Sequence, residues 1–440
     1  MKRSRKLLIL ALVLLALGCG TLIASKMTVE PGEVAAEEVT TILTLDPDTV
    51  TALRWTYSVD LGFFREGEIW RYEGSDAFPV DGSYLQAILD TLSRVESAKT
   101  IESIDNWDAY GLEIPVCTIS VTADKTYDLA IGTETTLGGQ RYFSIGDGKA
   151  YLVDSAILEP FQYGLYDLMA EQTMPQVEQV TAMTVTTPEG SYTLTFDPDS
   201  GRTYSDDYVW FWEDTPLDTG EATSLVGVVT QLSLSRCENY DAADLGAYGL
   251  DTPSLTATVY DGGAEAYTLG ISEPRDGECY VNLPGTAMVF SIDDAIYETL
   301  RYTTAPDLTP TDVLRMDWDT VSAVTLTLGE ESGTFTRGED EDTGETIWQE
   351  NGEEAALGDI LTGITDLSAT GSAAGLTPTG EPRLTVEIRR ERETFPHVTL
   401  ALYPYSSENC LVTLEGEATV TVARRDVADL VAEVSKLLEN

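Results

Sequence analysis

The sequence has 440 residues, 42% of them hydrophobic, and it carries 75 acidic against 26 basic residues, for a formal net charge of −49. This hydrophobic content excludes a globally disordered chain, and the length predicts about three domains. A surface this negative repels nucleic acid and anionic lipid headgroups, so we expect no nucleic-acid partner.

The N-terminus has the pattern of a membrane anchor. A cluster of basic residues precedes an apolar run that extends from Leu7 to Ala24; the basic residues are Lys2, Arg3, Arg5 and Lys6. As a helix, this run is close in length to the hydrocarbon core of a bilayer, and positive charge before the run predicts a cytoplasmic N-terminus. We therefore predict that residues 1–25 are a cytoplasmic stub and transmembrane anchor of a single-pass cell-membrane protein whose remaining chain is extracytoplasmic. A lipoprotein signal that uses Cys19 and a cleaved secretory signal are the alternatives.

An acidic tether, residues 26–45, is expected to follow the anchor. After it, the chain repeats one order of predicted elements three times, beginning each time with an alternating apolar–polar strand at Val50, Val180 and Val321. Within each copy this strand is followed by a tryptophan strand, an amphipathic helix, a short turn motif, further strands and a closing helix. The predicted modules span residues 46–174, 175–309 and 310–440. The expected fold class is α+β, with an N-terminal transmembrane helix followed by three tandem modules of antiparallel sheet with packed helices.

The turn motif stands at the middle of each module. Its first copy is Tyr110-Gly111-Leu112 with Pro115, and its second copy is Tyr248-Gly249-Leu250 with Pro253. The glycine suits a left-handed residue after a last helical turn, and the leucine suits the apolar contact that accompanies such a cap. The proline prevents the helix from resuming. We predict Asp105 and Asp241 as the N-caps of these turns, and Gly375-Leu376 as a weaker third copy.

These repeated units, together with the anchor, resemble the bacterial family called domain of unknown function 4340 (DUF4340). The Tyr-Gly-Leu-x-x-Pro motif, the tryptophan strand and a strand ending near Gly132 or Gly270 carry the resemblance, which covers essentially all of the chain outside the anchor and tether. The resemblance implies a single-pass, outward-facing protein, often encoded beside ABC-2-type export permeases and proteins similar to the gliding-motility auxiliary component. No catalytic residues are established for the family, so the resemblance assigns none.

Residues that could carry catalysis or bind metal are few and scattered. The one histidine, His397, lies in a predicted strand without the nucleophile and carboxylate that a catalytic histidine needs, so we interpret it as a strand-surface residue. Four cysteines show no metal-binding spacing, and we interpret them as buried thiols whose disulfide status stays open; they are Cys117, Cys237, Cys279 and Cys410. We expect no cofactor and no enzymatic activity.

Two acidic loops and one aromatic strand are the remaining candidates. Residues 197–201 and 338–345 carry spaced carboxylates, but both stand where the module needs a hairpin turn. The turn is our main interpretation, and weak divalent-cation binding is the alternative. Trp210 and Trp212 project from one face of a strand, where they either fill a core or form a candidate binding surface.

The expected function is that of a non-enzymatic extracytoplasmic scaffold or accessory subunit of a membrane ABC-type export complex. Its partners would be the membrane, through the N-terminal helix, and a permease complex. The alternative is a binding module for cell-envelope polysaccharide or another extracellular ligand.

Overall fold

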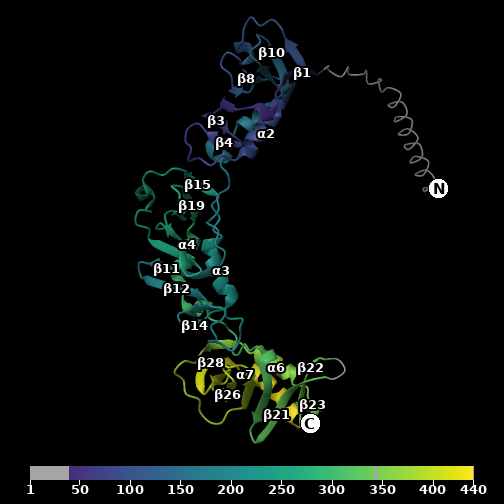
Figure 1. Ribbon diagram of the computed structural model, residues 1–440, viewed down its shortest axis with the longest axis vertical. Helices are drawn as coiled ribbons and strands as arrows, with labels where there is room; N and C mark the ends of the chain where they lie inside the picture. Colours follow the sequence, from purple (N-terminus) through teal and green to yellow (C-terminus); the bar gives the residue numbers. More distant parts are fainter. Residues whose placement is uncertain (1–38, 341–343, 440) are drawn as a thin grey trace, which may run out of the picture. The chain divides into compact units, whose positions relative to one another are not determined.

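The computed structural model describes residues 39–340 and 344–439. These residues form four sheets and a few helices, and their strand pairs are antiparallel, which confirms an α+β fold built mostly of antiparallel sheet. The chain divides into two compact units, Met1–Glu171 and Gln172–Asn440. The first unit holds one large sheet, and the second holds two (Figure 1).

The first unit contains an eight-stranded sheet and a separate pair of strands. The large sheet has the order β4 (Ile69–Tyr72), β3 (Asp60–Glu66), β2 (Ala52–Thr56), β7 (Cys117–Thr122), β8 (Thr126–Glu134), β9 (Gln140–Ser144), β10 (Ala150–Asp154), β6 (Lys99–Ile101). The separate pair is β1 (Thr40–Thr44) with β5 (Arg94–Ser97). The helices are η1 (Pro47–Thr49), α2 (Gly82–Ser93), η2 (Asp108–Tyr110), η3 (Ser155–Phe161) and η4 (Leu165–Leu168), where η marks a 3-10 helix.

The second unit contains two nine-stranded sheets whose strand orders match each other position by position. Its first sheet has the order β14 (Thr215–Pro216), β13 (Trp210–Trp212), β12 (Gly190–Phe196), β11 (Val180–Thr187), β16 (Leu255–Asp261), β17 (Ala264–Ile271), β18 (Glu278–Asn282), β19 (Val289–Asp293), β15 (Arg236–Asn239). Its other sheet has the order β23 (Glu353–Glu354), β22 (Thr346–Glu350), β21 (Glu331–Glu339), β20 (Val321–Leu328), β25 (Leu384–Arg390), β26 (His397–Pro404), β27 (Asn409–Leu414), β28 (Glu417–Ala423), β24 (Ala369–Ser372).

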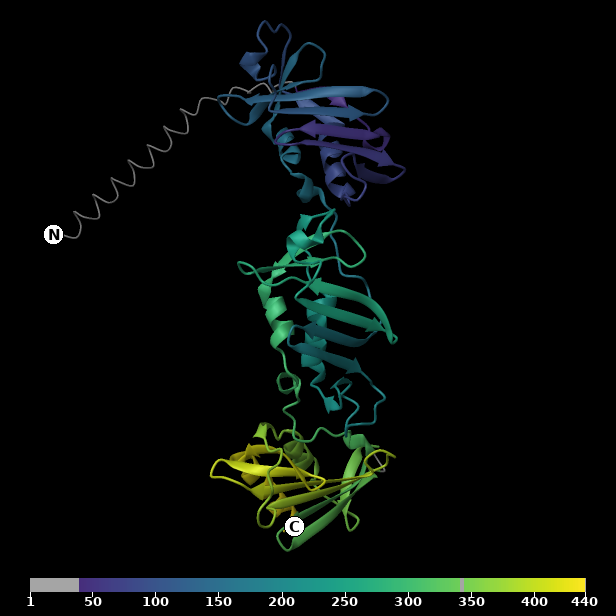
Figure 2. The same cartoon turned by 90° about the vertical axis from the view of Figure 1, so that its left-hand side faces the viewer.

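Below, the large sheets are called the first, second and third sheets in chain order. Helices lie against the sheets of the second unit: α3 and α4 contact the second sheet, and α7 contacts the third (Figure 2, teal and green for the second sheet). The helices of this unit are α3 (Thr219–Thr230), η5 (Leu245–Tyr248), α4 (Asp294–Tyr302), α5 (Ala305–Leu308), η6 (Trp318–Thr320), α6 (Gly358–Thr365) and α7 (Arg424–Leu438).

The amphipathic helices α2, α3 and α6 each bury one apolar face, and α2 and α3 begin at aspartate caps. Asp81 accepts a hydrogen bond from the Ser83 amide at the start of α2, and Asp218 accepts one from the Glu221 amide at the start of α3. Such caps satisfy amide groups that the first helical turn leaves without partners. The core residues of α2 are Leu85, Ile88, Leu89 and Leu92. The sequence prediction of these helices is therefore confirmed.

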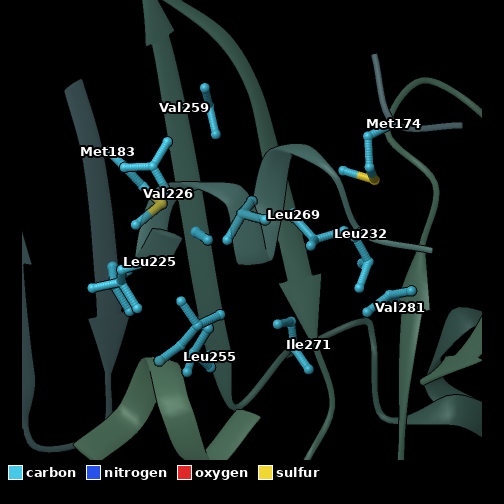
Figure 3. Packing of buried hydrophobic residues seen from close by; sticks show 14 of the residues in the cluster. Met174, Met183, Leu225, Val226, Leu232, Leu255, Val259, Leu269, Ile271 and Val281 are labelled. Carbon is cyan, nitrogen blue, oxygen red and sulfur yellow. The ribbon is translucent and has the colours of Figure 1, made fainter. Parts of the chain in front are cut away.

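Each large sheet has its own hydrophobic core. In the second sheet, Leu225 and Val226 of α3 pack among strand residues from β16 and β17, including Leu255 and Leu269 (Figure 3). All four side chains are at most 5% exposed. Alternate residues of β16 and β17 therefore enter the core, and their neighbours lie on the opposite face.

Only the last residues of the predicted N-terminal segments can be compared with the structure. The predicted anchor, residues 1–25, lies outside the described residues, and so does most of the predicted tether, residues 26–45. The last part of that tether is folded, because Thr40–Thr44 forms β1 and Leu43 is buried. A five-residue strand is too short for its alternation to stand out from an acidic stretch. None of the helices formed by residues 39–340 and 344–439 is long and apolar enough to cross a membrane.

We expect Leu269→Ala to lower the free energy of unfolding of the second sheet by about 2–5 kcal/mol, because it removes a fully buried side chain. Native-state hydrogen exchange of the β16 and β17 amides measures this change. The matched control is Thr268→Ala on the opposite face of β17, where the Thr268 hydroxyl meets that of Thr258 at 2.8 Å. Its loss should cost at most about 1 kcal/mol. An equal effect of the two substitutions would contradict the assignment of the faces.

Candidate functional site

The turn motif ends a short 3-10 helix in both of its complete copies. Gly111 and Gly249 have φ angles of 63° and 71°, in the left-handed region that was predicted for them. The amide of Leu112 donates to the Trp107 carbonyl at 3.1 Å, and the amide of Leu250 donates to the Leu245 carbonyl at 3.0 Å. These bonds satisfy carbonyl groups at the helix end.

The predicted N-caps of these turns, Asp105 and Asp241, are wrong. The first turn begins at Trp107, with no side-chain cap, and the second begins at Asp244, whose carboxylate accepts from the Gly246 amide at 2.9 Å. The helices are one turn of 3-10 helix, shorter than expected, so the cap lies closer to the glycine. The side chain of Asn239 instead accepts from the Asp241 amide at 3.0 Å.

The motif packs closely against the second strand that follows it in the chain. A Cβ atom at Gly132 of β8 would overlap the Tyr110 carbonyl oxygen and lie 3.1 Å from Leu112, and a Cβ at Gly270 of β17 would lie 3.1 Å from the Pro253 ring. Small residues at these two positions let the motif approach the sheet. This contact explains why the turn motif and the glycine of the later strand occur together in the first two repeats of the sequence.

Tyrosine pairs complete the packing of the motif. The rings of Tyr110 and Tyr142 lie 4.8 Å apart, and those of Tyr248 and Tyr280 lie 5.3 Å apart, both edge to face. In the second sheet, Leu250 belongs to a small cluster separate from the main core. The motif therefore has a structural role, which is to cover part of a sheet outside the main core.

The third copy of the motif keeps only its backbone turn. Gly375 has a φ angle of 80°, but Leu376 is 38% exposed and a Cβ at Gly375 would meet nothing within 4 Å. The residue at the strand position of Tyr142 and Tyr280 is Leu411, so the tyrosine pair is lost.

The tryptophan strand belongs mainly to the core. Trp210 is 5% exposed and lies in the core of the second sheet, as the equivalent Trp70 and Trp348 do in the other two. Trp212 lies on the same face, is half-buried and stacks on Tyr192 with ring centroids 4.3 Å apart. A buried indole cannot meet a ligand, so only Trp212 remains as a candidate binding residue.

The remaining sequence candidates lie apart from one another. His397 is an exposed residue of β26 opposite Arg389, as a strand-surface histidine should be. The carboxylate of Asp197 lies 3.1 Å from the Arg202 guanidinium, so that acidic turn is held by an internal ion pair. The loop at 338–345 includes residues 341–343, which lie outside the described part. Among the residues that the structure describes, no three His, Cys, Asp or Glu side chains are grouped to hold a metal ion.

Three clefts lie beside the first residues of the closing helices, and the first two occupy equivalent places in the fold. Their volumes are about 720 Å³ beside α2, 420 Å³ at the second sheet and 400 Å³ between α6 and α7. In the first cleft, Val95, Val153 and Ile157 are buried and form an apolar floor. The equivalent floor of the second cleft includes Ile292 and Ile296.

An arginine–glutamate ion pair lies beside each of the first two clefts: Arg94 and Glu96 both line the first, whereas Arg236 and Glu278 line the second. Arg94 lies 2.6 Å from Glu96, and Arg236 lies 2.8 Å from Glu238. The Arg236 guanidinium also lies 2.7 Å from Glu278, so two carboxylates fix its position. Both arginine side chains are more than 60% exposed, and they remain accessible to a partner.

A repeated hexapeptide marks these rims, and our sequence predictions missed it. Leu-Ser-Arg-Val-Glu-Ser at 92–97 and Leu-Ser-Arg-Cys-Glu-Asn at 234–239 follow the amphipathic helix in the first two copies. The third copy reads Leu-Ser-Ala-Thr-Gly-Ser at 367–372, so the arginine and glutamate are replaced. Its cleft has instead a rim of carboxylates alone: Asp359, Asp366, Asp426, Asp429 and Glu433.

An apolar floor with a charged rim is a common arrangement at protein interfaces. The arginine supplies a planar donor for a carboxylate or a backbone carbonyl, and the glutamate beside it accepts from an amide or a cation. The cleft is therefore suited to bind a peptide segment of a partner.

The four described cysteines are free thiols, and three of them are fully buried. Burial raises the pKa of Cys117 and Cys279 to about 12 and that of Cys237 to about 11. These groups stay protonated near neutral pH and are poor nucleophiles. The prediction of buried thiols is confirmed for Cys117, Cys279 and Cys410, whereas Cys237 is partly exposed.

Two segments of the chain, residues 70–209 and 212–384, match the family model described as Domain of unknown function (DUF4340). Together they cover more than half of the sequence. Each match begins at a tryptophan strand, in β4 or in β13, so the matched unit starts in one sheet and ends in the next. No curated protein and no solved structure matches the chain.

We expect Gly132→Ala to lower the free energy of unfolding of the first sheet by roughly 1–3 kcal/mol, because the added methyl group overlaps the turn motif. Thermal unfolding measures the effect. Gly358→Ala is the matched control, because a Cβ there meets nothing within 4 Å, and it should leave stability unchanged or raise it slightly. Similar losses in both variants would show that the contact between motif and strand is unimportant.

Stability should also fall in alkaline solution because of the raised thiol pKa values. The unfolded thiols titrate near pH ~8.5 and the folded ones near 11 to 12, so the contribution is complete below the unfolded pKa and is lost as pH rises through the folded pKa. Urea unfolding at pH 8 and pH 10.5 measures this loss. Cys117→Ala should reduce the difference between the two pH values, and an unchanged difference would contradict it.

Proposed function

This chain belongs to the DUF4340 family, and we propose that it is a non-enzymatic extracytoplasmic scaffold or accessory subunit of a membrane ABC-type export complex. In this proposal the chain has three tandem modules of antiparallel sheet with packed helices, held at the cell membrane by a transmembrane helix in residues 1–25. The membrane and a permease complex are its partners.

The recurring cleft is the observation that carries the proposal. An apolar floor and an exposed arginine held by a glutamate occur in both of the first two clefts, with Arg94 beside Glu96 and Arg236 beside Glu278. A scaffold with two equivalent sites binds one partner at two places, or two copies of it, with a gain in avidity. Arg94 and Arg236 are held in ion pairs with neighbouring glutamates, which fixes the position of each guanidinium.

The location rests on sequence. The basic residues before the apolar run from Leu7 to Ala24 favour an extracytoplasmic chain, and the net charge of −49 favours solubility on that side. The resemblance to families encoded beside ABC-2-type permeases favours an export complex as the partner. A weak divalent-cation site among the acidic loops is compatible with this role.

A second candidate is a binding module for cell-envelope polysaccharide or another extracellular ligand. It is supported by Trp212, whose half-buried indole stacks on Tyr192, since flat aromatic pairs are suited to the apolar face of a sugar ring. Quenching of tryptophan fluorescence by glycans, lost in Trp212→Ala, would favour this candidate.

Co-purification of the full chain from its own membranes in mild detergent, followed by mass spectrometry, tests the scaffold. We expect a permease and its ATPase in stoichiometric amounts. Arg94→Glu combined with Arg236→Glu should lower their recovery by about tenfold, because both rims lose their donor and gain a repulsive charge.

The matched control is Arg71→Glu, which breaks an exposed ion pair with Glu66 on the first sheet, away from the cleft, and should leave recovery unchanged. Recovery of the chain alone, with bound glycan or with nothing, would overturn the scaffold in favour of the second candidate.

A further inference from the structure

One connection in the second sheet is much longer than its counterparts. The chain between β12 and β13 runs from residue 197 to residue 209, whereas the equivalent chain between β3 and β4 is residues 67 and 68. A hairpin turn needs only a few residues, so the additional length has another use.

This long connection contacts the third sheet. The Ser205 hydroxyl donates to Asp317 at 2.9 Å, and the Asp206 amide donates to the other oxygen of the same carboxylate at 3.1 Å. The Tyr204 ring packs edge to face on Phe395, with centroids 4.8 Å apart. Ser205 is only 2% exposed, so this residue is buried at the contact, whereas the neighbouring Asp206 stays exposed.

Two arginines at the end of β25 provide the opposite charge. Arg392 donates to both oxygens of Asp206, at 2.7 and 2.5 Å, and lies 3.6 Å from Asp317. Arg390 lies 3.9 Å from Asp317, and its side chain has no exposed surface. Two guanidinium groups and two carboxylates therefore form a balanced cluster at this contact.

A further ion pair extends the contact. Arg315 lies 2.6 Å from Asp207, and the Tyr208 hydroxyl donates to Asp312 at 3.0 Å. Residues 204–208 therefore bind the segment before β20 as well as the end of β25.

The matching charges belong to the third sheet alone among the sheets of this unit. Val321 of β20 faces Arg390, whereas the equivalent Val180 of β11 faces Asp261. At the equivalent position of the second sheet, an acidic segment would therefore meet the Asp261 carboxylate, which repels it. At the third sheet the same position carries the Arg390 guanidinium, which attracts it.

The docked state carries a cost. Both terminal nitrogens of Arg390 are buried without a hydrogen bond to a described protein group, and its Nε donates to Thr320 at 3.0 Å. Removing the Arg390 guanidinium from water costs free energy, and its few hydrogen bonds compensate this cost only in part. The remaining cost offsets much of the attraction between Arg390 and Asp317. The connection is therefore bound less tightly than its many contacts suggest.

We propose that residues 197–209 are a releasable latch that joins the second and third sheets into one rigid body when docked, and lets them move independently when it leaves the arginine pair. Because Asp206 and Arg392 are partly exposed, with side-chain exposures of 64% and 33%, salt screens their attraction and favours release.

Hydrogen exchange of the full chain, followed by mass spectrometry, tests the latch. We expect exchange of residues 203–208 to rise by about tenfold in Asp206→Arg and in Arg392→Asp, while the cores of both sheets stay protected. The double variant Asp206→Arg with Arg392→Asp should restore most of the protection. Raising the salt concentration to about 1 M should have the same direction of effect on the wild-type chain.

The control is Lys149→Glu, which breaks an exposed ion pair with Glu102 on the first sheet and should leave residues 203–208 unchanged. Two results would overturn the proposal. One is unchanged exchange of residues 203–208 in both single variants. The other is faster exchange throughout β20 and β25, which would make the cluster part of the third sheet's folding and not a latch.

Discussion

The antiparallel pair at the centre of each sheet is the contact on which the other strands depend. β2 pairs with β7, β11 with β16 and β20 with β25. Between the two partners the chain makes a tryptophan strand, an amphipathic helix and a turn motif, so the pair closes a long loop. Closing such a loop costs chain entropy, which the buried face of the completed sheet must offset. Helices such as α2 and α3 are short, and they persist because their apolar faces are covered by this sheet.

Local features of the fold could be predicted from the sequence because they depend on neighbouring residues. Strand alternation, the leucine spacing of α2 and the left-handed glycines at 111 and 249 are of this kind. The N-caps failed because several Asp and Asn residues compete within one turn, and only the backbone path selects Asp244. The strand β1 was missed because it is short, and because its partner, β5, is distant in sequence.

The candidate site depends on packing that periodicity does not report. Alternation places Trp210 and Trp212 on one face, but it cannot say that Phe211 is also covered, with the Arg202 guanidinium 4.0 Å above its ring. The arginine–glutamate rim did leave a sequence signal, the repeated hexapeptide after the amphipathic helix. That signal can be found by aligning the copies with one another, whereas a search for catalytic or metal-binding motifs passes over it.

The charge reversal between Asp261 and Arg390 has a consequence for how such a chain can change over generations. The second and third sheets share one strand order but are not interchangeable, because the acidic connection finds its counter-charge only on the sheet that carries the arginines. Inserting an additional copy between the second and third sheets would separate the matched surfaces, whereas lengthening the chain before the second sheet would leave them adjacent. Gain or loss of copies in related chains should therefore concentrate toward the N-terminal side, with the last two inherited as a pair.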